Sequence, residues 1–478
     1  MKTENKTFAQ RFAEFEKKEH LFERTYKGLP YWQMLRFVTY YEAIGDPVTK
    51  GDAVRKRNQG NKFIYFTRAL LLALKSGWNF HHLQECDVVC FTHKMKKQEK
   101  SNFFDTWKMP ANIRTLYLRE FSEPEYVTWK EEHNFVGPYV KSRLRLLVNK
   151  LLGNSERDEK EFLFLQQLED KLKGEFGASL SAERMEQEIQ HWRPLALESE
   201  KYAIKFFDKV KCKAIVVVCY YQNQLYSFYK VAKQRGIKII EFQHGMVKDH
   251  HCYWFEDQRG LNNYVPDYML TFGELHANWM KLLDSTKVVP VGFPLNDIQL
   301  KLVKDVKMND DVIIIYPEIL PGFEEELNTF ANIATKKGYK VFVKLHPMHT
   351  SRPETFYPLF SSNPNISLIT DLSKTSRYWL KYGKYHVFGR STVALEAVCF
   401  DHCRIYIADF VQHEQLEPLI DEGIAESFKT AEQLMERIES QKSTEKGHRE
   451  KFSHMLWQND AVHNIQRFFE GLQERNWQ

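Results

Sequence analysis

The stretch Lys340–Pro347, with the sequence KVFVKLHP, decides the fold that we expect for the second half of the chain. Its apolar run is typical of a buried β-strand and ends abruptly at the pair His346-Pro347. Because proline has no amide hydrogen and favours an extended conformation for the residue before it, the imidazole of His346 is expected at the carboxyl end of the strand. In open α/β sheets, ligands bind at that end.

A second strand end of this kind follows at Phe388–Thr392, with the sequence FGRST. Ser391 and Thr392 offer hydroxyl groups, Arg390 adds a cation, and the helix expected after them presents free backbone N–H groups. An ordinary helix N-cap would use the same residue types. Together with His346, however, this second strand end favours a site for a phosphate-bearing ligand.

Strand and helix patterns alternate on both sides of the middle of the chain. Ala214–Cys219 and Ile237–Phe242 are apolar runs typical of buried strands, with a helical segment between them, and a second series begins at Val312–Tyr316. A strand, a helix and a strand in this order imply a right-handed crossover. The sequence predicts an α/β protein of two Rossmann-like domains facing a cleft. We expect an N-terminal domain with helical additions over residues 1–300, a C-terminal domain over 301–442, and a helix over 443–478 that packs on one domain or crosses between them.

Length, charge and cysteine content narrow the class of protein. The 478 residues suffice for two domains with a full core each. The formal charge of +5 is spread along the sequence and is too small to indicate a nucleic-acid partner. Seven cysteines, an odd number that lies mostly in apolar runs, are typical of reduced thiols in a cytoplasmic protein. The N-terminus lacks the pattern of a secretion signal, and no apolar run reaches the length of about 18 residues that a membrane span needs.

Several motifs that would indicate other chemistry are missing. The chain has no Gly-x-Gly-x-x-Gly fingerprint and no P-loop, which argues against dinucleotide oxidoreductases and NTPases. It also has no Asp-x-Asp triplet to hold a cation on a diphosphate. Adjacent histidines at His250 and His251, near His244, are more typical of a surface turn than of a metal site. We therefore expect no metal and no cofactor.

The order of these motifs resembles a known family. The segment Leu345-His346-Pro347, the downstream Asp371 and the Ser391-Thr392 turn are similar to those of GT-B glycosyltransferases of bacterial capsule, lipopolysaccharide and teichoic acid synthesis. Bacterial sialyltransferases and polysialyltransferases share this pattern, as do the CDP-glycerol glycerophosphotransferases. The turn Phe242–Gly245, with the sequence FQHG, also resembles one in capsule and O-antigen biosynthesis proteins. The resemblance covers roughly residues 214–407.

The resemblance implies a donor site in the C-terminal domain, which would bind the nucleotide-sugar. His346, in its pair with Pro347, would contact the donor phosphate, Ser391 and Thr392 would bind it as well, and Asp371 would hold the ribose. Two further residues follow from their positions at strand ends. Arg390 would add positive charge at the phosphate, and Glu318, after the first strand of this domain, is expected either in the same site or as a loop cap.

The N-terminal domain would take the acceptor and supply the general base. A base must reach the acceptor hydroxyl within hydrogen-bond distance. The candidates are His244, Asp249 and Glu256, in that order, and they lie on or just after the loop that follows a predicted strand. For His244, holding the turn or contacting the donor is an equal alternative.

The leading hypothesis is a metal-independent glycosyltransferase that moves a sugar from a nucleotide-activated donor, CMP-linked as for sialic acid or Kdo, to a growing bacterial surface polysaccharide or lipopolysaccharide. Two alternatives stay open: transfer of a phosphopolyol from a CDP-linked donor, and a non-catalytic scaffold that binds glycans or nucleotides. The partners would be a nucleotide-sugar and a glycan or glycolipid acceptor. Lys141–Leu152 reads as a basic amphipathic helix, which either packs on its domain or rests on anionic lipid at the cytoplasmic face of the inner membrane.

Overall fold

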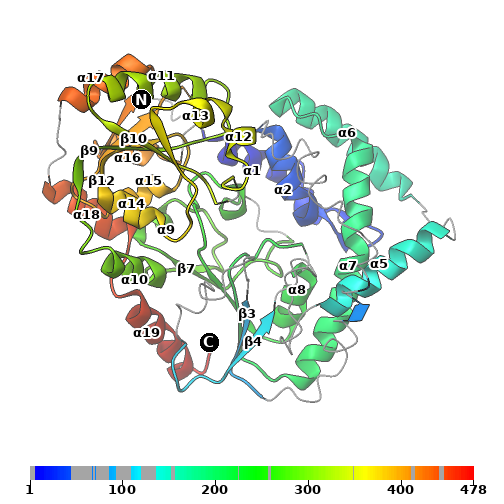
Figure 1. Ribbon diagram of the computed structural model, residues 1–478. Helices are drawn as coiled ribbons and strands as arrows, with labels where there is room; N and C mark the ends of the chain where they lie inside the picture. The colour runs from blue at the N-terminus through cyan, green and yellow to red at the C-terminus, as the bar shows by residue number, and fades with distance from the viewer. Residues whose placement is uncertain are drawn as a thin grey trace, which may run out of the picture. The chain divides into compact units, whose positions relative to one another are not determined.

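The computed structural model of the chain describes residues 6–44, 67, 70–71, 85–92, 109–119, 136–151, 157–223, 225–256, 260–347, 349–410, 415–440 and 446–477. Contacts divide the chain into two compact units. The first comprises residues 1–271, 277–291 and 462–478, and the second comprises residues 272–276 and 292–461. Each unit contains one six-stranded sheet in which all the strand pairs are parallel. Two Rossmann-like sheets with flanking helices confirm the predicted α/β class (Figure 1).

The sheet of the first unit has the strand order β4-β3-β5-β6-β7-β8. Strands β5 and β7 are buried at every residue, as is typical of parallel sheets that are covered on both faces. The strands are β3 (Val88–Thr92), β4 (Thr115–Arg119), β5 (Ala214–Val217), β6 (Lys238–Phe242), β7 (Tyr268–Thr271) and β8 (Lys287–Pro290).

Helical segments precede this sheet and interrupt it between β4 and β5. The long helix α7 begins at the N-cap Ser181, whose side chain accepts a hydrogen bond from the amide of Arg184, and α5 packs along it (Figure 1). A short hairpin of β1 (Thr25–Tyr26) and β2 (Leu29–Pro30) lies between the first two helices. The helices are α1 (Phe8–Lys18), η1 (Leu21–Glu23), α2 (Trp32–Ala43), α5 (Val136–Leu151), α6 (Glu159–Phe176), α7 (Ala182–Lys209), α8 (Tyr226–Gln234) and η4 (His251–Tyr253). The short helix α9 (Glu274–Asn278) begins in the second unit and ends in the first.

The sheet of the second unit has the order β11-β10-β9-β12-β13-β14. Numbered from its own first strand, this order is 3-2-1-4-5-6, the arrangement of doubly wound nucleotide-binding folds, and it reverses between β9 and β12. The strands are β9 (Asn309–Tyr316), β10 (Lys340–Lys344), β11 (Ile366–Ile369), β12 (Gly383–Phe388), β13 (Arg404–Ala408) and β14 (Ala425–Phe428).

Alternating residues of β10 face different helices. Val341 and Val343 join the core that contains residues of α11 and α17, two helices that contact each other (Figure 1). Phe342 instead packs on Trp379 of α14, with ring centroids 5.8 Å apart. The helices of the unit are α10 (Pro294–Leu302), α11 (Phe323–Lys336), α12 (Pro353–Phe356), α13 (Pro358–Ser362), α14 (Ser376–Tyr382), α15 (Val393–Ala397), α16 (Glu417–Asp421), α17 (Ala431–Ser440) and α18 (Lys446–Leu456).

Regular elements form around the expected domain boundary at residue 301 and in the C-terminal segment. The stretch 301–311 contains the end of α10 and the start of β9, and the second unit already begins at Gly292. The C-terminal segment consists of α18 in the second unit and of α19 (Ala461–Glu474), which belongs almost wholly to the first. Phe469 of α19 packs on Phe242 of β6, with ring centroids 6.4 Å apart.

A buried arginine ties α18 to the segment between α15 and β13 in the second unit. The guanidinium of Arg449 donates to the carbonyls of Ala397, Val398 and Cys403, at 2.8, 3.3 and 2.7 Å. The carbonyls of Ala397 and Val398 lie at the C-terminal end of α15, which a cation stabilises, and Cys403 comes directly before β13. Arg449 therefore anchors the helix that follows the Ser391-Thr392 turn.

Within the residues that the structure describes, no helix combines the length and the apolar character that crossing a bilayer requires.

Candidate functional site

Four neighbouring strands of the second unit end beside one another, and each is followed by residues predicted for the donor site. The strands are β11, β10, β9 and β12, and all their pairings are parallel, so their carboxyl ends share one edge of the sheet. The residues that follow them, in the same order, are Asp371, His346 with Pro347, Glu318, and Arg390 with Ser391 and Thr392. The structure thus brings all the predicted donor-site residues to the edge at which such sheets bind ligands.

Glu318 and Arg390 meet where the strand order reverses. The backbone N–H of Arg390 donates to Oε1 of Glu318 at 3.2 Å, which joins the ends of β9 and β12. Burial raises the pKa of Glu318, and the positive charge of Arg390 opposes that rise. Gly389 makes the close approach possible, because a Cβ there would lie 2.6 Å from Cγ of Glu318. The carboxylate of Glu318 therefore both caps the turn and lies at the switch point of the sheet.

His346 is exposed, and a turn stabilised by its neighbours holds it in place. The backbone N–H of His349 donates to the carbonyl of His346 at 2.8 Å. The ring of His349 in turn contacts the hydroxyl of Tyr357 at 3.0 Å, and that hydroxyl donates to the carbonyl of Pro317 at 3.4 Å. This chain of contacts fixes the end of β10 against the end of β9. The motif HPMH contains the signal for His349, which our sequence reasoning missed.

Burial and hydrogen bonds set the pKa values of His346 after β10 and of Asp371 after β11. Although His346 reaches the surface, the groups packed around its ring lower its pKa, and the positive charge of Lys344 adds to the effect. Asp371 is exposed, and hydrogen bonds from the hydroxyl and the backbone N–H of Ser373 lower its pKa. At neutral pH the imidazole is therefore a neutral donor and acceptor, and the carboxylate is an acceptor. Lys344 is a second residue that our sequence reasoning missed.

The Ser391-Thr392 turn opens a very short helix. The hydroxyl of Ser391 accepts a hydrogen bond from the backbone N–H of Val393 at 3.4 Å, whereas Thr392 is exposed and its side chain makes no capping bond. Because α15 contains only five residues, its dipole is small. Positive charge at this edge therefore comes mainly from side chains rather than from the helix terminus.

The three candidate bases of the first unit occupy different surroundings. His244, half-buried after β6, contacts the hydroxyl of Tyr221 through Nε2 at 3.2 Å. Asp249 has a φ of +52° and forms an ion pair with Lys248 at 2.7 Å. Glu256 forms an ion pair with Lys281, whose backbone pairs with that of Trp254. His244 and Asp249 thus share the loop after β6. Glu256 lies beyond that loop, two residues after Trp254, whose backbone pairs with that of Lys281.

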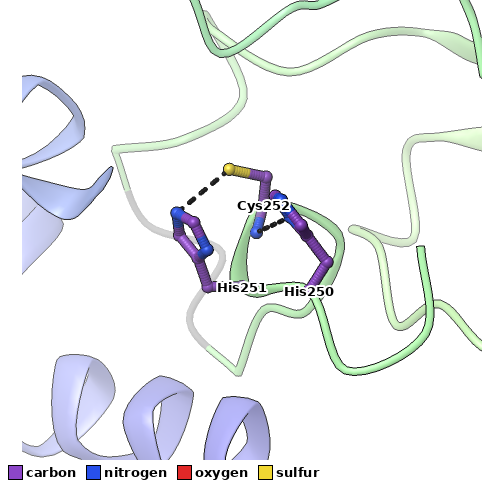
Figure 2. A group of neighbouring side chains, drawn as sticks. All are labelled: His250, His251 and Cys252. Atoms are coloured by element: carbon purple, nitrogen blue, oxygen red, sulfur yellow. Dashed lines mark hydrogen bonds between the residues drawn. The ribbon is translucent and has the colours of Figure 1, made fainter. Parts of the chain in front are cut away.

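His250, His251 and Cys252 form a cluster on η4 (Figure 2). One ligand atom from each residue lies within 4.8 Å of the others. Nε2 of His251 is 3.2 Å from Sγ of Cys252, and Nδ1 of His250 accepts a hydrogen bond from the amide of Cys252 at 3.3 Å. The positive charge of Arg36 acts on all three groups and would repel a cation. We interpret the cluster as a hydrogen-bonded part of the core, in which His244 takes no part.

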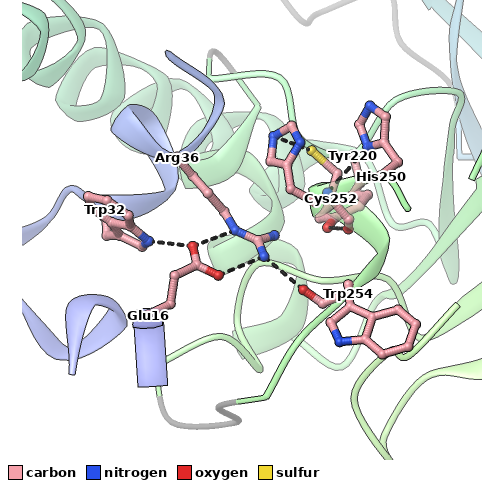
Figure 3. Close-up of polar contacts among 8 residues, drawn as sticks. Glu16, Trp32, Arg36, Tyr220, His250, Cys252 and Trp254 are labelled. Atoms are coloured by element: carbon pink, nitrogen blue, oxygen red, sulfur yellow. Dashed lines mark hydrogen bonds and ion pairs between the residues drawn. The ribbon is translucent and has the colours of Figure 1, made fainter. Parts of the chain in front are cut away.

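Arg36 belongs to a buried ion pair rather than to an open site (Figure 3). Its Nε and Nη2 donate to the carboxylate of Glu16 at 2.7 and 2.8 Å, and Nη2 also donates to the carbonyl of Trp254 at 2.8 Å. The indole N–H of Trp32 donates to the same carboxylate at 2.7 Å. The ion pair therefore connects α1 and α2 with the segment after η4.

Another group that sequence reasoning missed is Glu241 of β6, which is fully buried. Burial raises its pKa well above the usual value, and the hydroxyl of Tyr253 donates to its Oε1 at 3.1 Å. A small cavity of about 20 Å³ lies close by, lined by Arg36, Tyr220, Tyr221 and other mainly aromatic residues. The cavity has room for about one water molecule and is too small for a sugar.

Neither a protein-family model nor a curated protein matches the chain. Among solved structures, UDP-GlcNAc 2-epimerase from Methanocaldococcus jannaschii in complex with UDP-GlcNAc and UDP is similar with a TM-score of 0.40 and 16% identity over 60% of this chain and 81% of that chain. MurG from Acinetobacter baumannii has a TM-score of 0.36 and 11% identity over 58% and 80%. The glycotransferase of kitacinnamycin has a TM-score of 0.41 and 10% identity over 64% and 89%. At these scores the likeness carries no argument about activity, so the class of protein stated here is the one that the strands define: an α/β protein with two Rossmann-like sheets.

Proposed function

We propose that the chain is a GT-B glycosyltransferase that transfers a sugar from a CMP-linked donor, such as CMP-sialic acid or CMP-Kdo, to a bacterial surface polysaccharide or lipopolysaccharide. The observation that carries the proposal is the edge of the second sheet. Glu318 and Arg390 meet at its switch point, and His346 and Asp371 follow the two strands next to β9 on one side. The resemblance of the His346-Pro347 and Ser391-Thr392 motifs to capsule and lipopolysaccharide transferases supports the choice of donor and acceptor.

In this proposal, side chains of the second unit stabilise the leaving nucleotide. His346 and Arg390 donate to the phosphate, the hydroxyls of Ser391 and Thr392 add further donors, and the carboxylate of Asp371 accepts from the ribose hydroxyls. Because arginine is permanently charged, it can offset the phosphate charge without a divalent ion. We therefore propose that the reaction needs no metal.

The bond changes in the transfer step are simple. The acceptor hydroxyl oxygen bonds to the anomeric carbon, the bond from that carbon to the phosphate oxygen breaks, and the electron pair leaves with the nucleotide. The proton of the hydroxyl passes to a base, for which we propose His244. An imidazole can accept a proton near neutral pH, whereas the carboxylates of Asp249 and Glu256 form ion pairs with Lys248 and Lys281.

Nucleotide release from a panel of donors tests the proposal. We expect the protein to release CMP from a CMP-linked sugar when a glycan acceptor is present. The rate should be unchanged in EDTA, because side chains offset the negative charge of the phosphate. Release should be followed by chromatography of the nucleotide and of the glycan product.

The other outcomes separate the alternatives. Consumption of a CDP-linked polyol, with a phosphopolyol on the acceptor, would identify a phosphotransferase instead. Activity that is lost in EDTA and restored by Mg²⁺ would contradict the metal-independent step. Donor binding without release of nucleotide from any donor would favour the scaffold.

We also propose that the first unit contacts anionic lipid through α5. Leu144, Leu147 and Val148 are exposed on one face of this helix, at the spacing of successive turns. The other face packs on α7, where Arg145 forms an ion pair with Glu198 at 3.3 Å, so not every cation of the helix is left in water. Lys141 is half-buried on the same helix, and its charge interacts with Glu198 as well, so the exposed apolar residues carry the proposed contact.

Vesicle sedimentation tests the lipid contact. We expect binding to vesicles that contain phosphatidylglycerol, and a decrease of about tenfold for Leu147→Asp, because a buried leucine contributes about 1.5–3 kcal/mol. Leu163→Asp on α6 is the matched control, since Leu163 is also an exposed leucine of this unit. Equal losses in both variants, or equal binding to neutral vesicles, would contradict the proposal.

A further inference from the structure

Lys344 ends the strand that leads to His346, and its side chain is buried. It pairs with Ile369 at the end of β11 and lies on the same face of β10 as Phe342, which packs on α14. Only 7% of Lys344 is exposed, although the neighbouring His346 and Asp371 are exposed. A lysine is thus buried at the ligand-binding edge of the sheet, between two residues of the proposed donor site.

The ammonium group of Lys344 is poorly compensated. Within the described part of the chain, its hydrogen bond is a long one of 3.4 Å to the carbonyl of Leu345. The charge of Asp371 acts on it, but the carboxylate of Asp371 accepts hydrogen bonds from Ser373 instead. An ammonium has three donors, and a buried cation without close acceptors is costly. Burial accordingly lowers the pKa of Lys344, which the charge of Asp371 partly offsets.

We propose that Lys344 is an anion-binding residue of this site, and that its ammonium donates to the phosphate of the nucleotide donor together with His346. The proposal rests on the proposed function, which names the phosphate as the ligand of this edge. A phosphate supplies the oxygen acceptors that the ammonium lacks, and the attraction is stronger at a desolvated cation than at one in water.

The alternative is a purely structural lysine that stabilises the end of β10 and balances Asp371. The two roles differ in what happens when the charge is removed. Replacing a poorly compensated buried cation by an apolar side chain of similar length costs little stability or even increases it. A structural lysine would instead leave phosphate binding intact and lower the stability when replaced.

Calorimetric titration with inorganic pyrophosphate and with CMP distinguishes an anion-binding lysine from a structural one. We expect Lys344→Met to lower the affinity for both ligands at least tenfold, while the melting temperature stays equal or rises. Lys344→Arg should retain part of the affinity because it keeps the charge. Lys340→Met is the matched control: it removes an exposed lysine from the other end of the same strand and should bind as the wild type does.

Each outcome decides between the two proposals. Wild-type affinity in Lys344→Met would overturn the role of the lysine, and a lower melting temperature with unchanged affinity would assign it to structure alone, while the proposed function would stand. If the wild-type protein bound neither pyrophosphate nor any nucleotide, the proposed function itself would fail, and the role of Lys344 with it.

Discussion

His346→Ala is expected to lower the rate of nucleotide release by about 100- to 1,000-fold, which is the usual effect of removing one positioned donor from a developing negative charge. The side chain is exposed, so its loss should leave the melting temperature unchanged. Nucleotide release and thermal unfolding, measured on the same preparation, check both parts. His454→Ala is the control, because His454 is an exposed histidine of the same unit on α18.

The pH dependence gives an independent check on His346. The pKa of His346 is lowered, so the imidazole is neutral at pH 7. It gains its charge only in the acidic pH range below the ordinary pKa of histidine. A bound anion favours the charged form, so the affinity for pyrophosphate should increase as the pH falls through that range. His346→Gln keeps a donor but cannot titrate, and should lose this increase. For the first prediction, an unchanged rate of nucleotide release in His346→Ala would show that His346 does not act in the site.

Arg36→Met is expected to destabilise the first unit by about 3–5 kcal/mol, because it leaves the buried carboxylate of Glu16 without its cation. Both side chains are almost completely buried, and no solvent replaces the lost hydrogen bonds. A large decrease in the melting temperature, or in the denaturant concentration at the midpoint of unfolding, would be measured. The double variant Glu16→Leu/Arg36→Met should recover part of the loss.

The control for this prediction is an ion pair at the surface. Arg114 pairs with Asp87 at 3.0 Å, but 62% of the side chain of Arg114 is exposed. Arg114→Met should therefore change the melting temperature only slightly. A similar small change for Arg36→Met would show that the carboxylate of Glu16 is reached by water or protonated at little cost, contrary to the buried ion pair.

Much of the second unit could be predicted from short stretches of sequence. The apolar run before His346-Pro347 and the one before Arg390 form β10 and β12, and the predicted residues follow their carboxyl ends. Such patterns are local: an apolar strand that stops at a proline or at a turn glycine needs no distant partner to be recognised. The same holds for β6 and the turn that carries His244.

The pairing of residues from distant strands could not be predicted in this way. Glu318 and Arg390 meet only because β9 pairs with β12, and a sequence pattern does not contain the order of the strands. The ion pair of Glu256 with Lys281 likewise depends on a pairing between two segments that have no strand pattern of their own. The burial of a side chain could not be predicted in this way either: Lys344 has a charged side chain, yet the assembled sheet buries it.

The amino-acid pattern alone therefore determines that β10 is followed by a histidine and β12 by a turn with two hydroxyl side chains. Backbone preferences and apolar alternation act over only a few residues, so this information is local. Only the folded chain decides that the strand order reverses between β9 and β12, that Glu318 caps the turn of Arg390, and that Lys344 is buried beside His346. Contacts between distant segments and the removal of charges from water arise when the whole sheet assembles, and these set the electrostatics of the site.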